Sequence, residues 1–241
     1  MIHKNCFRIR LSRLVLTVAI AINTVSMSGV SVFASDDISE TVTEVSVPSG
    51  NDDVIAPPFI DIDKDDWFYD DVSYAWYIDV MNGISSDIFA PNMSTTRATI
   101  VTFLWRLAGK PSAELEVEFG DVEDSAWYAD AVGWAASNGL ALGYGDGSFG
   151  PKDSITREQM AVILYRYVQM TGDVSSDVVI TLDYVDTADI SAYAYEAICY
   201  MTENGIIGGL PGNVLDPKGV ATRAQVAAIL HRFNEKVIID D

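Results

Sequence analysis

The sequence has little of three residue types on which many protein functions depend, namely cysteine, histidine and the basic residues. Only two cysteines and two histidines occur among 241 residues, which is too few for a zinc site or a recurring Cys–His pair. The 15 Lys and Arg stand against 35 Asp and Glu, giving a net charge of −20. A chain with this field does not attract nucleic acid or an anionic membrane through its overall charge.

The N-terminus has the three-part pattern of a secretory leader. Four basic residues within the first 13 positions precede an uncharged apolar run from Leu14 to Ile22, and Val32-Phe33-Ala34 has the small-x-small form of a cleavage site. The alternative is a membrane anchor, but polar residues interrupt the run before it reaches the length of a bilayer span. We expect residues 1–34 to be a signal peptide, cleaved before Ser35.

Cleavage would change both the charge and the cysteine content of the mature chain. The 11 basic and 35 acidic residues that remain give a net charge of −24, and Cys6 leaves with the leader. Cys199 would then stand alone, so the mature fold must be held together by its apolar core.

Residues 35–58 are rich in Ser, Thr, Asp and Glu and predict a flexible spacer. A short edge strand over Thr41 to Val47 is the alternative.

Three copies of one unit follow the spacer. The recurring positions are Phe59-Ile60-Asp61, Phe119-Gly120-Asp121 and Tyr184-Val185-Asp186, then Trp67, Trp127 and Tyr193, then Gly83, Gly143 and Gly209, and finally Thr96-Arg97, Thr156-Arg157 and Thr222-Arg223. The first step is 60 residues, and the second is 65 at the aspartate and 66 afterwards, so one residue is inserted near Ala188. We therefore expect repeats at 59–118, 119–183 and 184–241.

Each repeat predicts a helix, a glycine-rich loop and a second helix. The first helices are expected over 69–77, 128–138 and 193–204, and the second and third of these end at Asn-Gly, where glycine suits a left-handed helix stop. Asp79 takes the place of that glycine in the first repeat, which predicts a less well defined stop. The second helices carry apolar stripes at helical spacing. The sequence thus predicts a mainly α fold with the second helices packed at the centre.

The Thr-Arg pair at each second helix has one part that is explained and one that is not. Thr156 with Gln159 and Thr222 with Gln225 form capping boxes, and Thr96 with Thr99 is a weaker version. The arginines follow at the positive end of the helix dipole, where a cation is unfavourable by about 0.3–1 kcal/mol. An anion is therefore expected opposite Arg97, Arg157 and Arg223. It is either an internal carboxylate such as Asp61, Asp121 or Asp186, or an acidic ligand.

Together these motifs resemble the S-layer homology domain, over about residues 59–233. The resemblance implies a pseudo-threefold spindle around a central three-helix bundle, with grooves that bind secondary cell-wall polysaccharides, often pyruvylated. It places Arg97, Arg157 and Arg223 against the acidic sugar. The chain departs from the Thr-Arg-Ala-Glu pattern because Thr99, Gln159 and Gln225 replace the glutamate, and Tyr193 replaces a tryptophan. The three grooves are therefore expected to differ in affinity.

Several other recurring positions have two interpretations. Trp67 and Trp127 either stack on a sugar or cover the core, and core or mixed use is favoured because large aromatics are usually buried. The loops around Gly83, Gly143 and Gly209 either approach a ligand or form tight turns. The run from Asp61 to Asp66 resembles the start of a calcium loop, but the sixth position lacks glycine and the twelfth lacks glutamate.

No nucleophile–base pair recurs, so the sequence predicts no catalysis and no cofactor. We expect a secreted, non-enzymatic protein whose partner is an acidic secondary cell-wall polysaccharide. We expect no nucleic-acid binding and no membrane insertion once the leader is removed. The alternatives are a structural protein that self-associates into a surface layer and an extracellular module that binds other proteins.

Overall fold

The computed structural model describes residues 6–12, 56–113 and 118–239. Each repeat contributes a short helix followed by a longer one, and the pairs are α1 Tyr69–Tyr77 with α2 Arg97–Leu107, α3 Ala129–Ser137 with α4 Arg157–Thr171, and α5 Tyr195–Glu203 with α6 Arg223–Asn234. A π-helical turn, η2 Glu235–Ile239, extends α6. The prediction of a mainly α fold is confirmed.

All three long helices begin at the predicted threonines. Thr156 and Thr222 form complete capping boxes with Gln159 and Gln225, because each glutamine side chain also accepts from the backbone N–H of its threonine. Thr96 Oγ1 accepts from the backbone N–H of Thr99 at 3.4 Å and shares a hydrogen bond of 3.0 Å with the Thr99 hydroxyl, but this cap lacks the reciprocal bond that a glutamine makes in the other two repeats. The weaker cap expected in the first repeat is therefore present.

The short helices end on a left-handed residue in every repeat. Gly139 and Gly205 have φ of +70° and +67°, as the Asn-Gly pairs predict. Asp79 takes the same conformation with φ of +55°, and the side-chain amide of Asn82 donates to its carboxylate. The less well defined stop expected in the first repeat is therefore wrong, since an aspartate adopts the backbone conformation of the glycines.

The third repeat differs from the others where its extra residue lies. A single 3₁₀ turn, η1 Thr187–Asp189, follows Asp186 and contains Ala188. The inserted residue is absorbed in this turn, so the helices on either side keep the register of the repeat.

A two-stranded antiparallel sheet joins β1 Cys6–Ser12 to β2 Asp173–Ile180, which follows α4. β1 lies within the predicted leader, and the rest of the leader and nearly all of the spacer lie outside the described residues. Cys199 on α5 is buried and disulfide-bonded in this structure, which retains the predicted leader. The expectation of a lone cysteine rested on prior cleavage, and it does not describe this structure.

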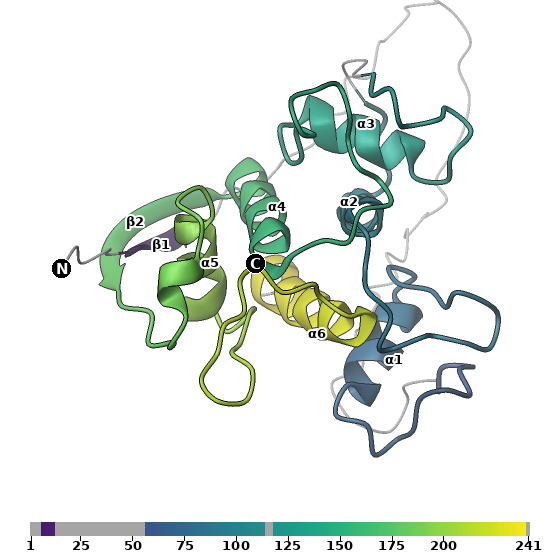
Figure 1. The fold of residues 1–241 in the computed structure, drawn as a ribbon, viewed down its shortest axis with the longest axis horizontal. Helices are drawn as coiled ribbons and strands as arrows, with labels where there is room; N and C mark the ends of the chain where they lie inside the picture. The colour runs from purple at the N-terminus through teal and green to yellow at the C-terminus, as the bar shows by residue number, and fades with distance from the viewer. Residues whose placement is uncertain (1–5, 13–55, 114–117, 240–241) are drawn as a thin grey trace, which may run out of the picture.

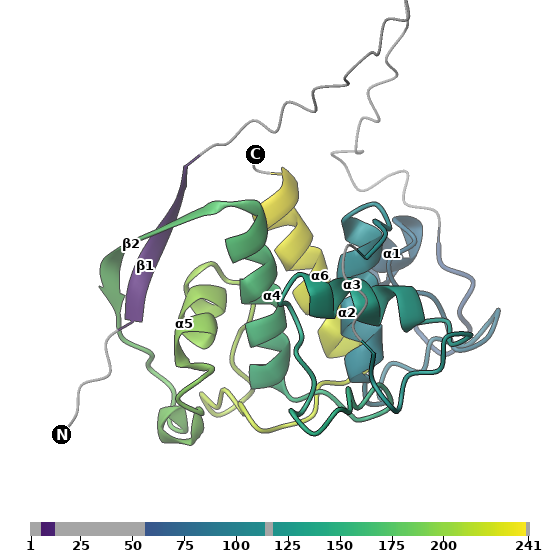
Figure 2. The same cartoon turned by 90° about the horizontal axis from the view of Figure 1, so that it is seen from above.

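The repeats are packed against one another in a cycle (Figure 1). The short helix of each repeat lies against the long helix of the one before it, so α3 contacts α2, α5 contacts α4, and α1 contacts α6. The last contact joins the first repeat to the third. A second view shows the long helices side by side, with the connecting loops gathered at one end (Figure 2). The complete threefold symmetry of the predicted central bundle stays a prediction.

Three backbone hydrogen bonds form a closed ring between the residues that lie two positions before the long helices. Thr95 N–H donates to the carbonyl of Ala221 at 3.0 Å, Ala221 N–H to Ile155 at 3.2 Å, and Ile155 N–H to Thr95 at 2.9 Å. All three residues are buried. Since each repeat supplies one member, the ring sets the three helix starts side by side.

Candidate functional site

The helix-start arginines bind the backbone of the next repeat. The Nε of Arg97 donates to the carbonyl of Phe149 at 3.0 Å, that of Arg157 to Leu215 at 2.8 Å, and that of Arg223 to Phe89 at 2.7 Å. All three arginines are buried. Among the described residues, no ion pair joins them to a carboxylate. The anion expected opposite each arginine is replaced, in the protein itself, by a carbonyl oxygen.

The recurring aspartates serve the same loops from inside their own repeats. Asp61, Asp121 and Asp186 each accept from two consecutive backbone N–H groups at 2.7–2.8 Å. Burial acts to raise the pKa of Asp121, but the N–H groups of Phe149 and Gly150 outweigh it and hold that pKa below its usual value. The aspartates thus fix the loop whose carbonyl receives the arginine of the preceding repeat.

The recurring glycines make room for an aromatic ring. A Cβ at Gly83, Gly143 or Gly209 would lie 2.5–2.7 Å from the ring of Phe59, Phe119 or Tyr184, respectively. Of these glycines, only Gly143 also has a positive φ, of +71°. The two interpretations from sequence were ligand approach and a tight turn. The structure supplies close packing against the aromatic that opens each repeat as a further reason for the glycine.

The three recurring aromatics at the helix entry are largely exposed. The exposed fractions are 64% for Trp67, 64% for Trp127 and 60% for Tyr193. The core or mixed use favoured for the two tryptophans is therefore wrong for most of their surface, although each ring contacts its neighbour, Phe68 or Tyr128, edge to face. Of the other tryptophans, Trp134 is buried in the core, and Trp76 and Trp105 are partly buried against that core.

The three arginines differ in what their remaining nitrogens contact. Nη2 of Arg157 donates to Gly208 at 2.7 Å, and Nη2 of Arg223 donates to Asn82 at 2.5 Å. Burial lowers the pKa of both guanidinium groups. For Arg97 the described residues provide only the Nε bond, and its guanidinium lies over the ring of Tyr144 at 4.7 Å. The Nη nitrogens of Arg97 are therefore the ones open to an outside acceptor.

Arg97 lines a groove of about 300 Å³, which we call the Arg97 groove. The first repeat supplies Arg97, the second supplies Leu142 to Tyr144 and the α4 residues Ile163 and Arg166, and the third supplies Tyr193. The groove thus combines two cationic side chains, two phenols and an apolar wall. That composition suits an anionic ligand with sugar-like faces.

Arg166 is a groove residue that sequence reasoning missed. Its Nη1 donates to the carbonyl of Leu140 at 3.2 Å, and the side chain is only partly buried. Arg106 and Arg232 occupy the same register in the other repeats, nine residues after the helix-start arginine. This recurrence could have identified Arg166 from sequence, since an arginine at the same helix position in all three repeats indicates a shared role.

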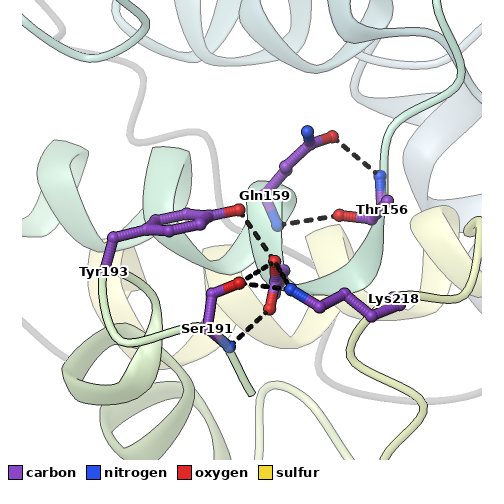
Figure 3. A network of polar contacts seen from close by, with 6 residues as sticks. Thr156, Gln159, Ser191, Tyr193 and Lys218 are labelled. Atoms are coloured by element: carbon purple, nitrogen blue, oxygen red, sulfur yellow. Dashed lines mark hydrogen bonds and ion pairs between the residues drawn. The ribbon is translucent and has the colours of Figure 1, made fainter. Parts of the chain in front are cut away.

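A buried carboxylate, that of Glu158, is hydrogen-bonded to the groove residue Tyr193 and to Ser191 and Lys218, three residues that Figure 3 shows in one polar network. Glu158 is 3% exposed and accepts from the hydroxyl of Tyr193 at 2.8 Å and from the ammonium of Lys218 at 2.6 Å. The backbone N–H and hydroxyl of Ser191 also donate to it, and Lys218 contacts that hydroxyl. Burial acts to raise the pKa of Glu158, but Lys218 and these donors lower it overall. Alanines, Ala98 and Ala224, hold this position in the other repeats.

Three stretches of the chain, residues 58–100, 118–161 and 183–227, match the S-layer homology domain. The chain belongs to this family. The matches coincide with the three repeats and end within their long helices, so the predicted register is confirmed. S-layer homology domains are cell-surface and cell-wall anchoring modules, and the repeats described here form such a module.

Relatives of these S-layer homology repeats lie within much longer proteins. The chain is 34% identical over 173 residues to an amylopullulanase of Thermoanaerobacterium thermosulfurigenes, covering 72% of this chain and 9% of that protein. It is 33% identical to exoglucanase XynX of Acetivibrio thermocellus, over 72% of this chain and 16% of the relative. It is 28% identical to a surface-layer 125 kDa protein of Lysinibacillus sphaericus, over 66% and 13%. The chain thus spans less than a fifth of the length of each of these three relatives.

In the part of the chain that the structure describes, no cluster of three or more His, Cys, Asp or Glu has the arrangement of a metal site. No described helix combines the length and apolar character that crossing a bilayer requires.

Proposed function

We propose that this chain is a secreted, non-enzymatic S-layer homology protein that binds an acidic secondary cell-wall polysaccharide, with the Arg97 groove as its main site. The observation that carries the proposal is the difference between Arg97 and its two counterparts. Arg157 and Arg223 each use Nε and Nη2 on the backbone of the next repeat, whereas Arg97 uses only Nε among the residues that the structure describes. The free edge of a guanidinium matches a carboxylate, such as that of a pyruvate ketal.

The surroundings of Arg97 supply the rest of a sugar site. Tyr144 and Tyr193 offer ring faces and polar oxygens, and Arg166 adds a second cation to the lining of the groove. The net charge of the protein is strongly negative, so these cations act locally and select the ligand by contact. Trp67 and Trp127, exposed at the matching positions of the other repeats, would add weaker contacts along one polymer.

The comparisons support the location of this activity. The relatives include a surface-layer protein and a cellulosome-anchoring protein, the latter 37% identical over 95 residues. The enzymes among them match through a small share of their length, which is consistent with an attached anchoring module without catalysis of its own. Together with the predicted leader, this supports export and retention at the wall.

The proposal is tested by sedimentation of the protein with purified cell walls, before and after the secondary polymer is stripped by acid. We expect binding to disappear on stripping. Arg97→Ala should weaken binding at least tenfold, while Lys236→Ala, which removes an exposed cation far from the groove, should leave it unchanged. Binding that survives both stripping and Arg97→Ala would overturn the proposal. Assembly in the absence of walls would instead favour a self-associating layer protein.

A further inference from the structure

Tyr193 differs from its two counterparts in both chemistry and surroundings. Trp67 and Trp127 occupy the same position of the repeat, and an indole can only donate a hydrogen bond. A phenol normally both donates and accepts. The hydroxyl of Tyr193 donates to Glu158 at 2.8 Å, so its proton is committed to a side chain outside the groove. Toward the groove, its oxygen can act only as an acceptor.

Glu158 can hold this proton because its own charge is compensated. The carboxylate is 3% exposed, and Lys218 lies 2.6 Å from it while remaining 54% exposed on its own side chain. Ser191 fills further acceptor sites on the same carboxylate. A buried carboxylate without such partners would be costly and would repel an anion bound nearby. Paired with Lys218, Glu158 adds no net charge beside the Arg97 groove.

We propose that Glu158 is a positioning residue that makes Tyr193 a hydrogen-bond acceptor in the Arg97 groove. The groove then selects an anionic sugar that presents a free hydroxyl next to its acidic group, with the acid on Arg97 and the hydroxyl donating to Tyr193. This inference rests on the proposed function and adds a rule for the ligand. The first and third repeats carry Ala98 and Ala224 in place of Glu158, so they have no carboxylate at this position to hold the proton of a neighbouring side chain.

The titration of Tyr193 agrees with this assignment. Burial first, and then the hydrogen bond and charge of Glu158, raise its pKa to about 12. The proton is therefore held on the phenol throughout the physiological range, where it can continue to be donated to Glu158.

The test uses methyl 4,6-O-pyruvyl-β-D-mannopyranoside and its 2-deoxy and 3-deoxy analogues. Binding is measured by calorimetry on the full chain carrying Trp67→Ala and Trp127→Ala, two exposed changes that remove the other recurring aromatics. We expect one deoxy analogue to bind about tenfold more weakly than the parent, since it lacks the hydroxyl that Tyr193 accepts. Tyr193→Phe and Tyr193→Trp should reduce this ratio to below threefold.

Glu158→Ala is the decisive variant because the other repeats already accommodate alanine at this buried position. We expect it to remain folded and to bind the parent sugar about as weakly as the starting protein binds the deoxy analogue, so that most of the discrimination between the two sugars is lost. Discrimination equal to that of the starting protein, in either Glu158→Ala or Tyr193→Phe, would overturn the inference. If Arg97→Ala abolishes binding in that same case, the proposed function stands without it. Absence of both wall and probe binding in the starting protein would overturn both.

A second measurement needs no sugar. With 13C-labelled tyrosine, the Cζ resonance of Tyr193, assigned by its loss in Tyr193→Phe, is followed from pH 8 to 13. We expect its pKa to fall by at least one unit in Glu158→Ala, while that of Tyr144, which donates to Asp153 instead, stays unchanged. An unshifted Tyr193 pKa would overturn the role assigned to Glu158.

Discussion

Arg97 and its counterparts Arg157 and Arg223 occupy the same position after the same threonine cap, yet their guanidinium groups are used differently. Arg157 and Arg223 each donate to two carbonyls of the neighbouring repeat, whereas Arg97 donates to one and lies over Tyr144. A conserved-looking motif within one chain can therefore hold the fold together in two copies and remain open to a ligand in the third.

The largest expected difference is in stability. Arg157→Ala and Arg223→Ala each remove a buried side chain and leave two carbonyls without their donor, so we expect a loss of about 3–5 kcal/mol in the free energy of unfolding. Arg97→Ala leaves one such carbonyl and should cost about 1–2 kcal/mol. Urea unfolding of the full chain, followed by far-ultraviolet circular dichroism, measures all three. Equal losses in the three variants would contradict the claim that Arg157 and Arg223 contribute more to stability than Arg97 does.

The loop that contains Tyr144 offers a second comparison, between two glycines that both have a positive φ, Gly143 and Gly145. Gly143→Ala would place a Cβ 2.7 Å from the ring of Phe119 and 2.5 Å from the carbonyl of Ser148, and we expect it to cost about 2–3 kcal/mol. Gly145 also has a positive φ but open space around it, so Gly145→Ala should cost about 1 kcal/mol. Thermal unfolding of both variants separates the two causes of lost stability, the steric clash of the new Cβ and the backbone strain of alanine at positive φ.

Acid should weaken the loops on both sides of the comparison. Asp121 and Asp186 have lowered pKa values, so their contribution to stability is complete above the ordinary carboxyl pKa of about 4. It is lost as the pH falls through the lowered values, below pH 4. For Asp186, Arg157 adds to the lowering by the N–H groups of Leu215 and Asp216.

We therefore expect the melting temperature to fall steeply below pH 4. Asp186→Asn should flatten this dependence more than Asp121→Asn does, because only Asp186 has an arginine among the groups that lower its pKa. Melting curves from pH 7 to pH 2 test this. Parallel curves for the two variants would show that the charge of Arg157 has no influence on its loop.

The smallest expected effect lies in the caps. Thr156→Ala removes half of a complete capping box and should cost about 1 kcal/mol, and Thr222→Ala should match it. Thr96→Ala should cost about half as much, because its cap lacks the reciprocal bond from a glutamine to the N-cap backbone. Denaturant unfolding of the three variants measures these losses. A smaller loss for Thr96→Ala would distinguish the first repeat from the other two, as the contacts of Arg97 already do.

Much of this architecture could be predicted because it repeats. The register of the landmarks fixed three units, and the threonine caps located the start of every long helix. The extra residue near Ala188 was also locatable, because it shifts all later landmarks by one position. These features depend on short-range chemistry that the residue type itself discloses.

The contacts of the arginines could not be predicted, because their partners are backbone carbonyls. Every residue has a carbonyl, so Phe149, Leu215 and Phe89 carry no sign that their oxygens are acceptors. Glu158 was missed for a related reason. An acidic residue in the first turn of a helix normally faces water and favours the helix dipole, which explains it without a buried role. Burial in the core was favoured for Trp67 and Trp127 because aromatic size favours burial in general, but both are largely exposed with one edge-to-face contact.

The ring of Thr95, Ile155 and Ala221 has a mechanical consequence. In an open row of repeats, a pull on the first and last units would pass through the middle one in series. Here the first and third repeats are also joined directly, through α1 on α6 and through Arg223 on Phe89. Tension between the two outer units is therefore shared by parallel links, and all of them must shear before either unit can separate.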